Sequence, residues 1–359
     1  MNILSYVLAV FSVLGAIDYM LNNKYGIGKD WERGFYLLGT MALSMIGMIV
    51  LAPFIAYVLS PVLALIPEWI PFEPSIIVGS LLANDMGGAT LSLSLAKSES
   101  IGYFNGLVVA AMMGATTSFT LPLAMGMVEK RQHHSMLLGL MCGIIAVPIG
   151  CLIIGLVIGI SFMELLINLV PLVLLAIILV IGLTKKPDLC VKIFYILGIV
   201  VKVIITIGLV LGIIEFLIGY KVLPYIAPLE EGAMVVFNAA IVMSGAFPLI
   251  NLVGRVLRSP LKKVGKMVGM NDSSVLGFVA SLATNVTTFG MMKNMDDKGV
   301  VLNSAFAVSG AFTFAGHLAF TMSFHSEYVP YVIFGKLIAG VLGVLIASVM
   351  IRNKVKSES

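Results

Sequence analysis

The sequence has 359 residues, of which 60% are apolar and only 11% are Asp, Glu, Lys or Arg. Soluble domains carry about 25% charged residues, so this composition excludes a soluble enzyme, a disordered regulator and a nucleic-acid binder. The net charge of +4 is too small and too scattered to track a phosphate backbone. The three cysteines form no CxxC pair, which argues against a disulfide framework and a zinc site. A multi-pass membrane protein is the class that remains.

Apolar segments long enough to enter a bilayer recur along the whole chain, since a spanning helix needs about 20 residues. In chain order, the sequence predicts helices over 2–21, 35–59, 75–96, 104–127, 136–160, 162–183, 195–218, 233–254, 273–295, 300–323 and 328–350. The first segment lacks a basic region and an obvious cleavage site, so we interpret it as a retained span rather than a signal peptide.

Two of these segments carry polar residues at their centres. Segment 75–96 contains Asn84-Asp85-Met86-Gly87-Gly88, and segment 273–295 contains Thr284-Asn285-Val286-Thr287-Thr288. Irregular polar backbone at membrane depth is tolerated only where it faces protein or a water-lined cavity. These two segments are therefore expected to be broken helices.

The distribution of Lys and Arg indicates whether the two polar segments cross the membrane. If all eleven segments cross, the Lys and Arg residues of alternate loops balance at 10 against 10, which contradicts the positive-inside rule. If 75–96 and 273–295 enter and return to the same side, the counts become 18 against 2. The sequence thus predicts an all-α polytopic membrane protein with nine full spans and two re-entrant segments. Its N-terminus lies outside and its C-terminus in the cytoplasm.

An internal repeat is consistent with this topology. Ser80-Leu81 through Asn84 resembles Ser281-Leu282 through Asn285, and Leu59-Ser60-Pro61 and Asn105 have counterparts in Arg258-Ser259-Pro260 and Asn303, all at offsets of 198 to 201 residues. We expect one transporter domain over 1–359, with repeat 1 at about 35–127 and repeat 2 at about 233–323. Inverted repeats whose broken helices meet near the midplane are typical of secondary transporters.

Asp85 is the strongest candidate for a functional residue. An ionised carboxylate near the bilayer centre costs about 3 kcal/mol on insertion scales. Gly87 and Gly88 follow it and allow a ligand or another chain to approach the backbone. Two interpretations stay open: Asp85 pairs with a cationic solute or coupling ion, or it is satisfied by Lys336, which lies inside the last span and is a candidate for an ion pair or a gate.

Other polar side chains in or beside the predicted membrane segments can hydrogen-bond a small hydroxylated solute, or each other across helices, at about 1 kcal/mol per contact. These candidates are Asn84, Asn105, Asn285, Thr287, Thr288 and Asn303. His317 is the only histidine within a predicted span and can relay protons, contact a solute or stay a hydrogen-bonded core residue. The sequence has neither a GxxxxGK[ST] loop nor an HExxH motif, so we expect no enzyme, no metal and no cofactor.

The stretch Leu81-Leu82-Ala83-Asn84-Asp85-Met86-Gly87-Gly88 resembles the EutH family of ethanolamine transporters from bacterial ethanolamine-utilisation operons. The similarity extends from about residue 3 to residue 350, and it adds Ser309 to the candidate site. Further similar stretches are Ala111-Met112-Met113-Gly114, Pro148-Ile149-Gly150-Cys151, Phe289-Gly290-Met291-Met292-Lys293, Met295-Asp296, Ala305-Phe306-Ala307-Val308-Ser309 and Gly335-Lys336-Leu337-Ile338.

The resemblance implies uptake or facilitated diffusion of protonated ethanolamine across the cytoplasmic membrane, where it would feed an ammonia-lyase in the cytosol. We expect Asp85 to hold the ammonium while Asn285 and nearby threonine hydroxyls contact the alcohol. Two alternatives stay open: a membrane sensor or assembly protein of the ethanolamine-utilisation system that carries no flux, and a transporter of a different small cationic or polar solute. The coupling ion, the direction of transport and homo-oligomer formation also stay open.

Overall fold

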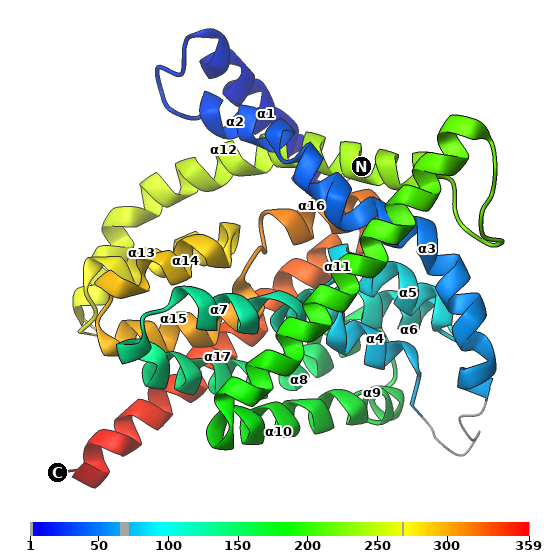
Figure 1. Ribbon diagram of the computed structural model, residues 1–359. Helices are drawn as coiled ribbons and strands as arrows, with labels where there is room; N and C mark the ends of the chain where they lie inside the picture. The colour runs from blue at the N-terminus through cyan, green and yellow to red at the C-terminus, as the bar shows by residue number, and fades with distance from the viewer. Residues whose placement is uncertain (1–2, 65–71, 268, 359) are drawn as a thin grey trace.

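The computed structural model describes residues 3–64, 72–267 and 269–358, and every regular element within them is helical (Figure 1). The long helices are α1 (Ile3–Met20), α3 (Leu38–Ala64), α8 (His133–Ile158), α10 (Val170–Lys185), α11 (Pro187–Ile218), α12 (Leu229–Met267) and α17 (Val329–Glu358). Within the described residues, seven helical stretches are long and apolar enough to cross a membrane. The number is eight if α9 (Phe162–Asn168) and α10, which meet at 43°, form one bent span. The prediction of a multi-pass helical membrane protein is confirmed.

Shorter helices connect the long ones or interrupt predicted spans. Near the chain start, α2 (Gly28–Tyr36) forms with α1 a hairpin that projects from the rest of the ribbon (Figure 1). The remaining connecting elements are α6 (Glu99–Tyr103), α7 (Leu121–Met127), η4 (Lys130–Gln132), η5 (Met292–Asn294) and η6 (Ser326–Tyr328).

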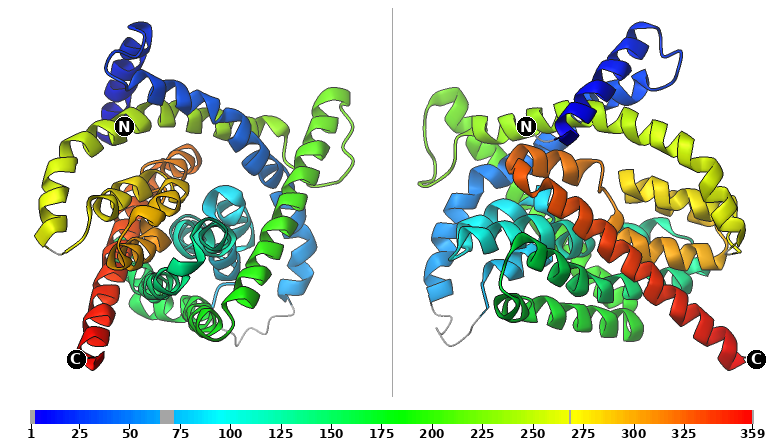
Figure 2. Two further views of the ribbon diagram at one scale, coloured as in Figure 1. Left: turned by 60° about the vertical axis from the view of Figure 1, so that its left-hand side comes forward. Right: turned by 180° about the vertical axis from the view of Figure 1, so that it is seen from behind.

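Two helices form the centre of the protein, and they fall at matching places in the predicted repeats. All residues of η2 (Phe104–Gly114) are buried, as are residues 299–310 of α15 (Asp297–Gly310). The left-hand view of Figure 2 shows α12, α3 and α11 running around the outside of the helices seen end-on. The outer helices expose Ile, Val and Leu side chains, as expected where the solvent is lipid.

Both predicted polar segments are broken helices. In the first, α4 (Ser75–Leu81) ends before the short η1 (Asn84–Met86), and α5 (Gly88–Leu95) continues the chain. In the second, α13 (Asp272–Ala283) ends at extended Thr284, and α14 (Asn285–Met291) follows. Gly87 reverses the chain at φ +100°, and a Cβ there would lie 2.2 Å from Met48 Cγ. Glycine is required at that position by both the backbone angle and the space.

A third interruption was not predicted. The segment 300–323, expected to be one span, divides into α15 and α16 (Gly316–Phe324), with residues 311–315 in turns. Phe312 adopts φ +58°, a left-handed conformation that is uncommon for a bulky residue. The amide N–H groups of Phe312 and Phe314 donate to the carbonyls of Ser281 and Leu282, each at 3.0 Å. The unpaired end of α13 therefore holds this turn in place.

The corresponding span in the first half stays continuous but changes its winding. The structure assigns π-helical geometry to η2 and to η3 (Thr116–Thr120). From this region, the Thr117 hydroxyl lies 3.1 Å from the carbonyls of Ser80 and Leu81 at the end of α4. Gly114 allows this close approach, because a Cβ there would lie 2.0 Å from the Leu82 carbonyl oxygen. The carbonyls at the end of α4 are thus approached by a side-chain hydroxyl, whereas the carbonyls at the end of α13 accept hydrogen bonds from backbone amides.

Asp296 ties the connection before α15 to the start of α13. Its carboxylate accepts hydrogen bonds from the amides of Asn271 and Gly299, both at 2.7 Å, and from the Ser274 hydroxyl at 2.9 Å. Burial raises the pKa of Asp296, but the hydrogen bonds from Asn271, Gly299 and Ser274 lower it further, so the net pKa falls below its usual 3.8. The ionised carboxylate is therefore part of the folded structure.

We expect Asp296→Ala to lower the free energy of unfolding by about 1–2 kcal/mol at neutral pH, as for other lost helix caps. A lowered folded-state pKa stabilises the fold above the unfolded-state pKa and stops doing so as the pH falls through the folded value. The difference between wild type and variant should therefore shrink below pH 3.8. Unfolding of the purified protein in detergent at neutral pH and below pH 3.8 measures this difference. The control is Asp297→Ala, which changes the exposed neighbouring carboxylate. An equal difference at both pH values would contradict this account.

Candidate functional site

An open pocket of about 250 Å³ lies where two of the helix interruptions meet. Its walls come from α2, α3, η1, α12, the end of α13 and the turn before α16. The residues that line it are Arg33, Leu37, Thr40, Met41, Ser44, Met45, Asp85, Met243, Phe247, Ala283, Thr284, Phe312, Ala315 and Gly316. The pocket thus combines apolar walls with hydroxyl groups and two charged side chains, a composition typical of small-ligand sites.

Asp85 is the only carboxylate among these lining residues. Its side chain is 21% exposed, and its Oδ1 lies 4.0 Å from Nε2 of His317. Arg33 is the other charged lining residue, and its guanidinium carbon lies 4.9 Å from the centre of the Phe247 ring. The pocket therefore presents a negative centre on η1 and a positive group on α2.

His317 and Lys336 continue the site from Asp85 into the protein. Lys336 on α17 is 1% exposed, and its Nζ lies 3.0 Å from His317 Nδ1 and 2.5 Å from the Ala111 carbonyl oxygen. An ammonium group can only donate hydrogen bonds. With Lys336 charged, His317 Nδ1 is therefore the acceptor, and the ring hydrogen sits on Nε2, facing Asp85. This places a carboxylate, an imidazole and an ammonium in a row.

Asn84 lies beside this row. It is fully buried, and its Nδ2 lies 3.5 Å from the Thr321 hydroxyl on α16, while its Oδ1 has no hydrogen-bond partner in the structure. The Thr321 hydroxyl in turn donates to the His317 carbonyl at 2.7 Å. The structure thus brings together the predicted residues Asn84, Asp85, His317 and Lys336. Gly87 and Gly88 form the adjoining backbone.

The second polar segment reaches the pocket through its first residue. Thr284 lines the pocket, but Asn285 is buried behind it and donates to the Thr120 hydroxyl at 2.9 Å and the Ala307 carbonyl at 3.3 Å. The Thr288 hydroxyl lies 2.9 Å from that of Ser281, and Thr287 is exposed. None of Asn285, Thr287 and Thr288 is among the described lining residues.

The structure places Asn105, Asn303 and Ser309 away from the pocket lining. Asn105 exchanges hydrogen bonds with Asn168, at 2.8 and 3.3 Å, and donates to Ser75 at 2.9 Å. Asn303 donates to two carbonyls of its surroundings at 2.7 and 2.9 Å. Ser309 is buried, and its hydroxyl has no hydrogen-bond partner in the structure. Asn105 and Asn303, matched in the predicted repeats, both tie a core helix to its broken neighbour.

Several lining residues were not predicted, chiefly Arg33, Thr40, Ser44, Phe312 and Gly316. Arg33 lies in a segment taken as a loop, and Thr40 and Ser44 lie in a segment taken as an ordinary span. Gly316 leaves space beside the carboxylate, since the nearest atom to a Cβ built there is Asp85 Oδ2 at 3.7 Å. The adjacency of Gly316 to His317 was the one sequence signal that pointed to it.

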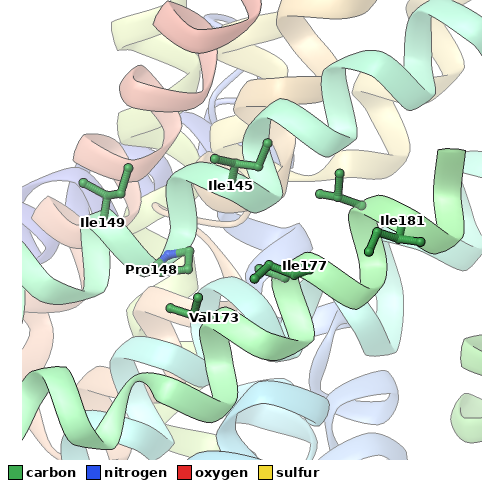
Figure 3. Close-up of a pocket in the computed structure, with 8 residues that line it drawn as sticks. Ile145, Pro148, Ile149, Val173, Ile177 and Ile181 are labelled. Carbon is green, nitrogen blue, oxygen red and sulfur yellow. The ribbon is translucent and has the colours of Figure 1, made fainter.

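A larger cavity lies elsewhere, between α8 and α10 (Figure 3). Its volume is about 390 Å³, and the residues that line it are all apolar, among them Ile145, Pro148 and Ile177. Such a surface offers no group to pair with a charged or hydroxylated ligand. The pocket at Asp85 is therefore the stronger candidate despite its smaller volume.

The fold and this site define a polytopic helical membrane protein whose broken helices surround a polar pocket, the architecture of a solute transporter. The family described as "Ethanolamine utilisation protein, EutH" matches residues 1–350. The chain belongs to this family.

Curated relatives match along nearly the full length of both chains. The "Probable ethanolamine permease EutH" of Listeria monocytogenes is 41% identical, covering 100% of this chain and 97% of the relative. The protein of the same name from Escherichia coli is 34% identical, covering 98% and 95%. The "Uncharacterized protein YxeR" of Bacillus subtilis is 35% identical, covering 96% and 93%. No solved structure matches the chain.

Proposed function

We propose that this chain is an ethanolamine permease of the bacterial cell membrane, a secondary transporter or facilitator that moves the protonated amine. The observation that supports this proposal most directly is the partly exposed Asp85 carboxylate, the one acidic group among the described lining residues of a pocket that is otherwise lined by apolar side chains, hydroxyl groups and Arg33. Full-length similarity to proteins named as probable ethanolamine permeases supports this choice of substrate.

The pocket suits a short amino alcohol chemically. A charge-assisted hydrogen bond between an ammonium and Asp85 is about twice as strong as a neutral one. The hydroxyls of Thr40 and Ser44 line the same pocket and donate to backbone carbonyls one turn earlier in the chain, so their oxygens can accept from an alcohol. The Thr284 hydroxyl accepts from the Val286 amide and can donate to the alcohol. A solute of four heavy atoms needs roughly 120 Å³ if each group occupies about the 30 Å³ of a water. The pocket volume of about 250 Å³ accommodates it with room for water.

The remaining predicted contacts require a second conformation. In the structure, Asn84 and His317 lie next to Asp85, but the other predicted hydroxyl and amide residues lie behind the pocket wall or outside it. We propose that they contact the substrate in a second state, in which the pocket extends between the two predicted repeats. These residues are Asn105, Asn285, Thr287, Thr288, Asn303 and Ser309.

We propose nine full spans and two re-entrant segments for the topology. Seven candidate spans, the bent pair α9–α10 and the interrupted pair α15–α16 together supply the nine. The C-terminus and the α12–α13 connection lie toward one side of the molecule, and the α11–α12 connection lies toward the other, in Figure 1 and in the right-hand view of Figure 2. This arrangement agrees with the predicted topology, in which the distribution of Lys and Arg assigns the C-terminus to the cytoplasm and the N-terminus to the outside. An inverted repeat over about 35–127 and 233–323 is part of the same proposal.

Uptake of labelled ethanolamine at low external concentration tests the proposed role of Asp85. Since hydrogen bonds to charged groups contribute about 1.5–3 kcal/mol, Asp85→Asn should lower uptake about 10- to 100-fold. Asp188→Asn, an exposed carboxylate at the start of α11, is the matched control and should keep wild-type uptake. Wild-type rates from a correctly inserted Asp85→Asn protein would refute the role of Asp85. Absence of saturable flux in vesicles with purified wild-type protein would favour a sensor or assembly protein.

Gly316 should control the size of amine that the pocket accepts. A methyl group at this position points into the space beside Asp85 Oδ2, so Gly316→Ala should disfavour an N-methylated ethanolamine more than ethanolamine itself. One methylene in a close-fitting pocket changes discrimination by about 10-fold or more. Competition by each unlabelled amine against labelled ethanolamine measures the ratio of the two apparent affinities, for the N-methylated amine and for ethanolamine. Gly126→Ala on the open surface of α7 is the control, and an unchanged ratio in Gly316→Ala would contradict the assignment.

Single cysteines at exposed loop positions test the proposed topology. The three native cysteines are buried, so a membrane-impermeant thiol reagent should label them little. A cysteine at Lys97, after the first broken segment, should be labelled from outside in intact cells. One at Lys293, after the second, should be labelled only when the cytoplasmic face is opened. Labelling of both from the same side would refute the inverted arrangement.

A further inference from the structure

Lys336 is a buried cation whose hydrogen-bond partners are both neutral acceptors. Its Nζ contacts His317 Nδ1 and the Ala111 carbonyl, and no carboxylate of the described residues lies within 4.0 Å of it. A lysine at membrane depth is costly and is retained where it pairs with another group or marks a path for ions or protons. The proposed substrate role of Asp85 does not by itself explain why this cation lies behind the pocket.

The nearest opposite charge is Asp85, which is separated from Lys336 only by the His317 ring. The charged groups of α15 and α8, the helices packed most extensively against α17, lie in the first turns of those helices, far from Lys336. Gly340 contacts Gly310 and Ala339 contacts Gly150, so the first turns of α15 and α8 are roughly 20–25 Å from Lys336 at 1.5 Å per residue. The titratable groups on elements packed against α17 are His133, His134, Cys142, Cys151, Asp297, Lys298, His317, Glu327 and Tyr328. Asp85 lies on η1, which packs against α16 and η2.

We propose that Lys336 is an internal counter-cation for Asp85 and that a substrate ammonium displaces its charge, so that binding releases one proton through His317. This inference rests on the proposed function and adds a coupling mechanism to it. Without substrate, the Asp85 carboxylate and the Lys336 ammonium balance each other in the buried part of the site, while the third charged group, Arg33 of the pocket lining, is exposed to solvent. With a substrate ammonium on Asp85 and Lys336 still charged, the site carries an unbalanced positive charge in a poorly screened environment. Loss of one proton restores neutrality.

The geometry supplies the path for this proton. The bond from Lys336 Nζ to one hydrogen breaks, and that hydrogen bonds to His317 Nδ1, which has a free lone pair in the assigned tautomer. The Nε2–H bond of His317 breaks, and its hydrogen passes to water in the pocket beside Asp85. Lys336 ends as a neutral amine and His317 as the other neutral tautomer. One proton thus leaves for each ammonium bound, so binding is an exchange of one cation for another.

Calorimetric titration of the purified full chain with ethanolamine, near neutral pH in two buffers of different ionisation enthalpy, tests this exchange. Wild type should release close to one proton per ethanolamine bound, and its affinity should rise about tenfold per pH unit while the ligand stays protonated. At a pH where its Asp85 is ionised, Lys336→Met should bind more tightly, release no proton and lose the pH dependence. Lys336→Arg, whose guanidinium stays charged, should bind at least tenfold more weakly and release none.

The controls separate this inference from the proposed function. Lys202→Met removes an exposed lysine from α11 and should keep the wild-type proton release. Ethanolamine binding by wild type without proton release, or equal release by wild type and Lys336→Arg, overturns the exchange and leaves the permease proposal intact. If Lys336→Met fails to fold, the wild-type proton count and its pH dependence still decide. Absence of any ethanolamine binding or flux in wild type overturns both.

Discussion

A backbone polar group inside a membrane needs a partner within the protein, and this requirement determines how the chain can be broken. Each interruption leaves helix-terminal carbonyls without their usual donors. At the end of α4 the hydroxyl of Thr117 lies within hydrogen-bond distance of two of them, and at the end of α13 the amides of Phe312 and Phe314 do so. Both broken segments are thereby hydrogen-bonded to the segments that follow the buried helices η2 and α15, so protein surrounds the polar backbone at the breaks.

The two halves meet the same requirement by different means, and the difference shapes the site. In the first half the central span stays continuous in π-helical form, and a side chain turns toward the break. In the second half the central span itself opens at residues 311–315, so that its backbone pairs with α13. This opening turns Phe312 and Gly316 toward the pocket and starts α16 with His317 facing Asp85. The pocket thus takes residues from both predicted repeats, although their two breaks are stabilised differently.

Hydropathy and charge placement predicted the helical membrane class, the two polar breaks and the residues Asp85, His317 and Lys336. They did not predict the break at 311–315, because Ala311-Phe312-Thr313-Phe314-Ala315 contains neither proline nor charge and reads as ordinary apolar span. Its cause is a tertiary contact, the hydrogen bonds to α13. Nor did they predict Thr40 and Ser44 as pocket residues, because single hydroxyls in a span commonly bond to their own helix, as Ser44 also does here.

A comparison of Asp85 with the buried Asp18 shows why Asp85 is the proposed ligand group. Asp18 is 1% exposed, and its carboxylate accepts backbone hydrogen bonds from Tyr25, Ile27 and Gly28 at 2.7–2.8 Å. The acceptor sites of the Asp18 carboxylate are used by these backbone amides, which closes the turn between α1 and α2. Asp85 instead has His317 Nε2 at 4.0 Å, beyond hydrogen-bond length, and oxygens that face the pocket. A carboxylate with acceptor capacity toward an open pocket can pair with a cationic ligand, which a fully hydrogen-bonded carboxylate such as Asp18 cannot do without losing its backbone contacts. This difference is why the proposed substrate contact lies at Asp85.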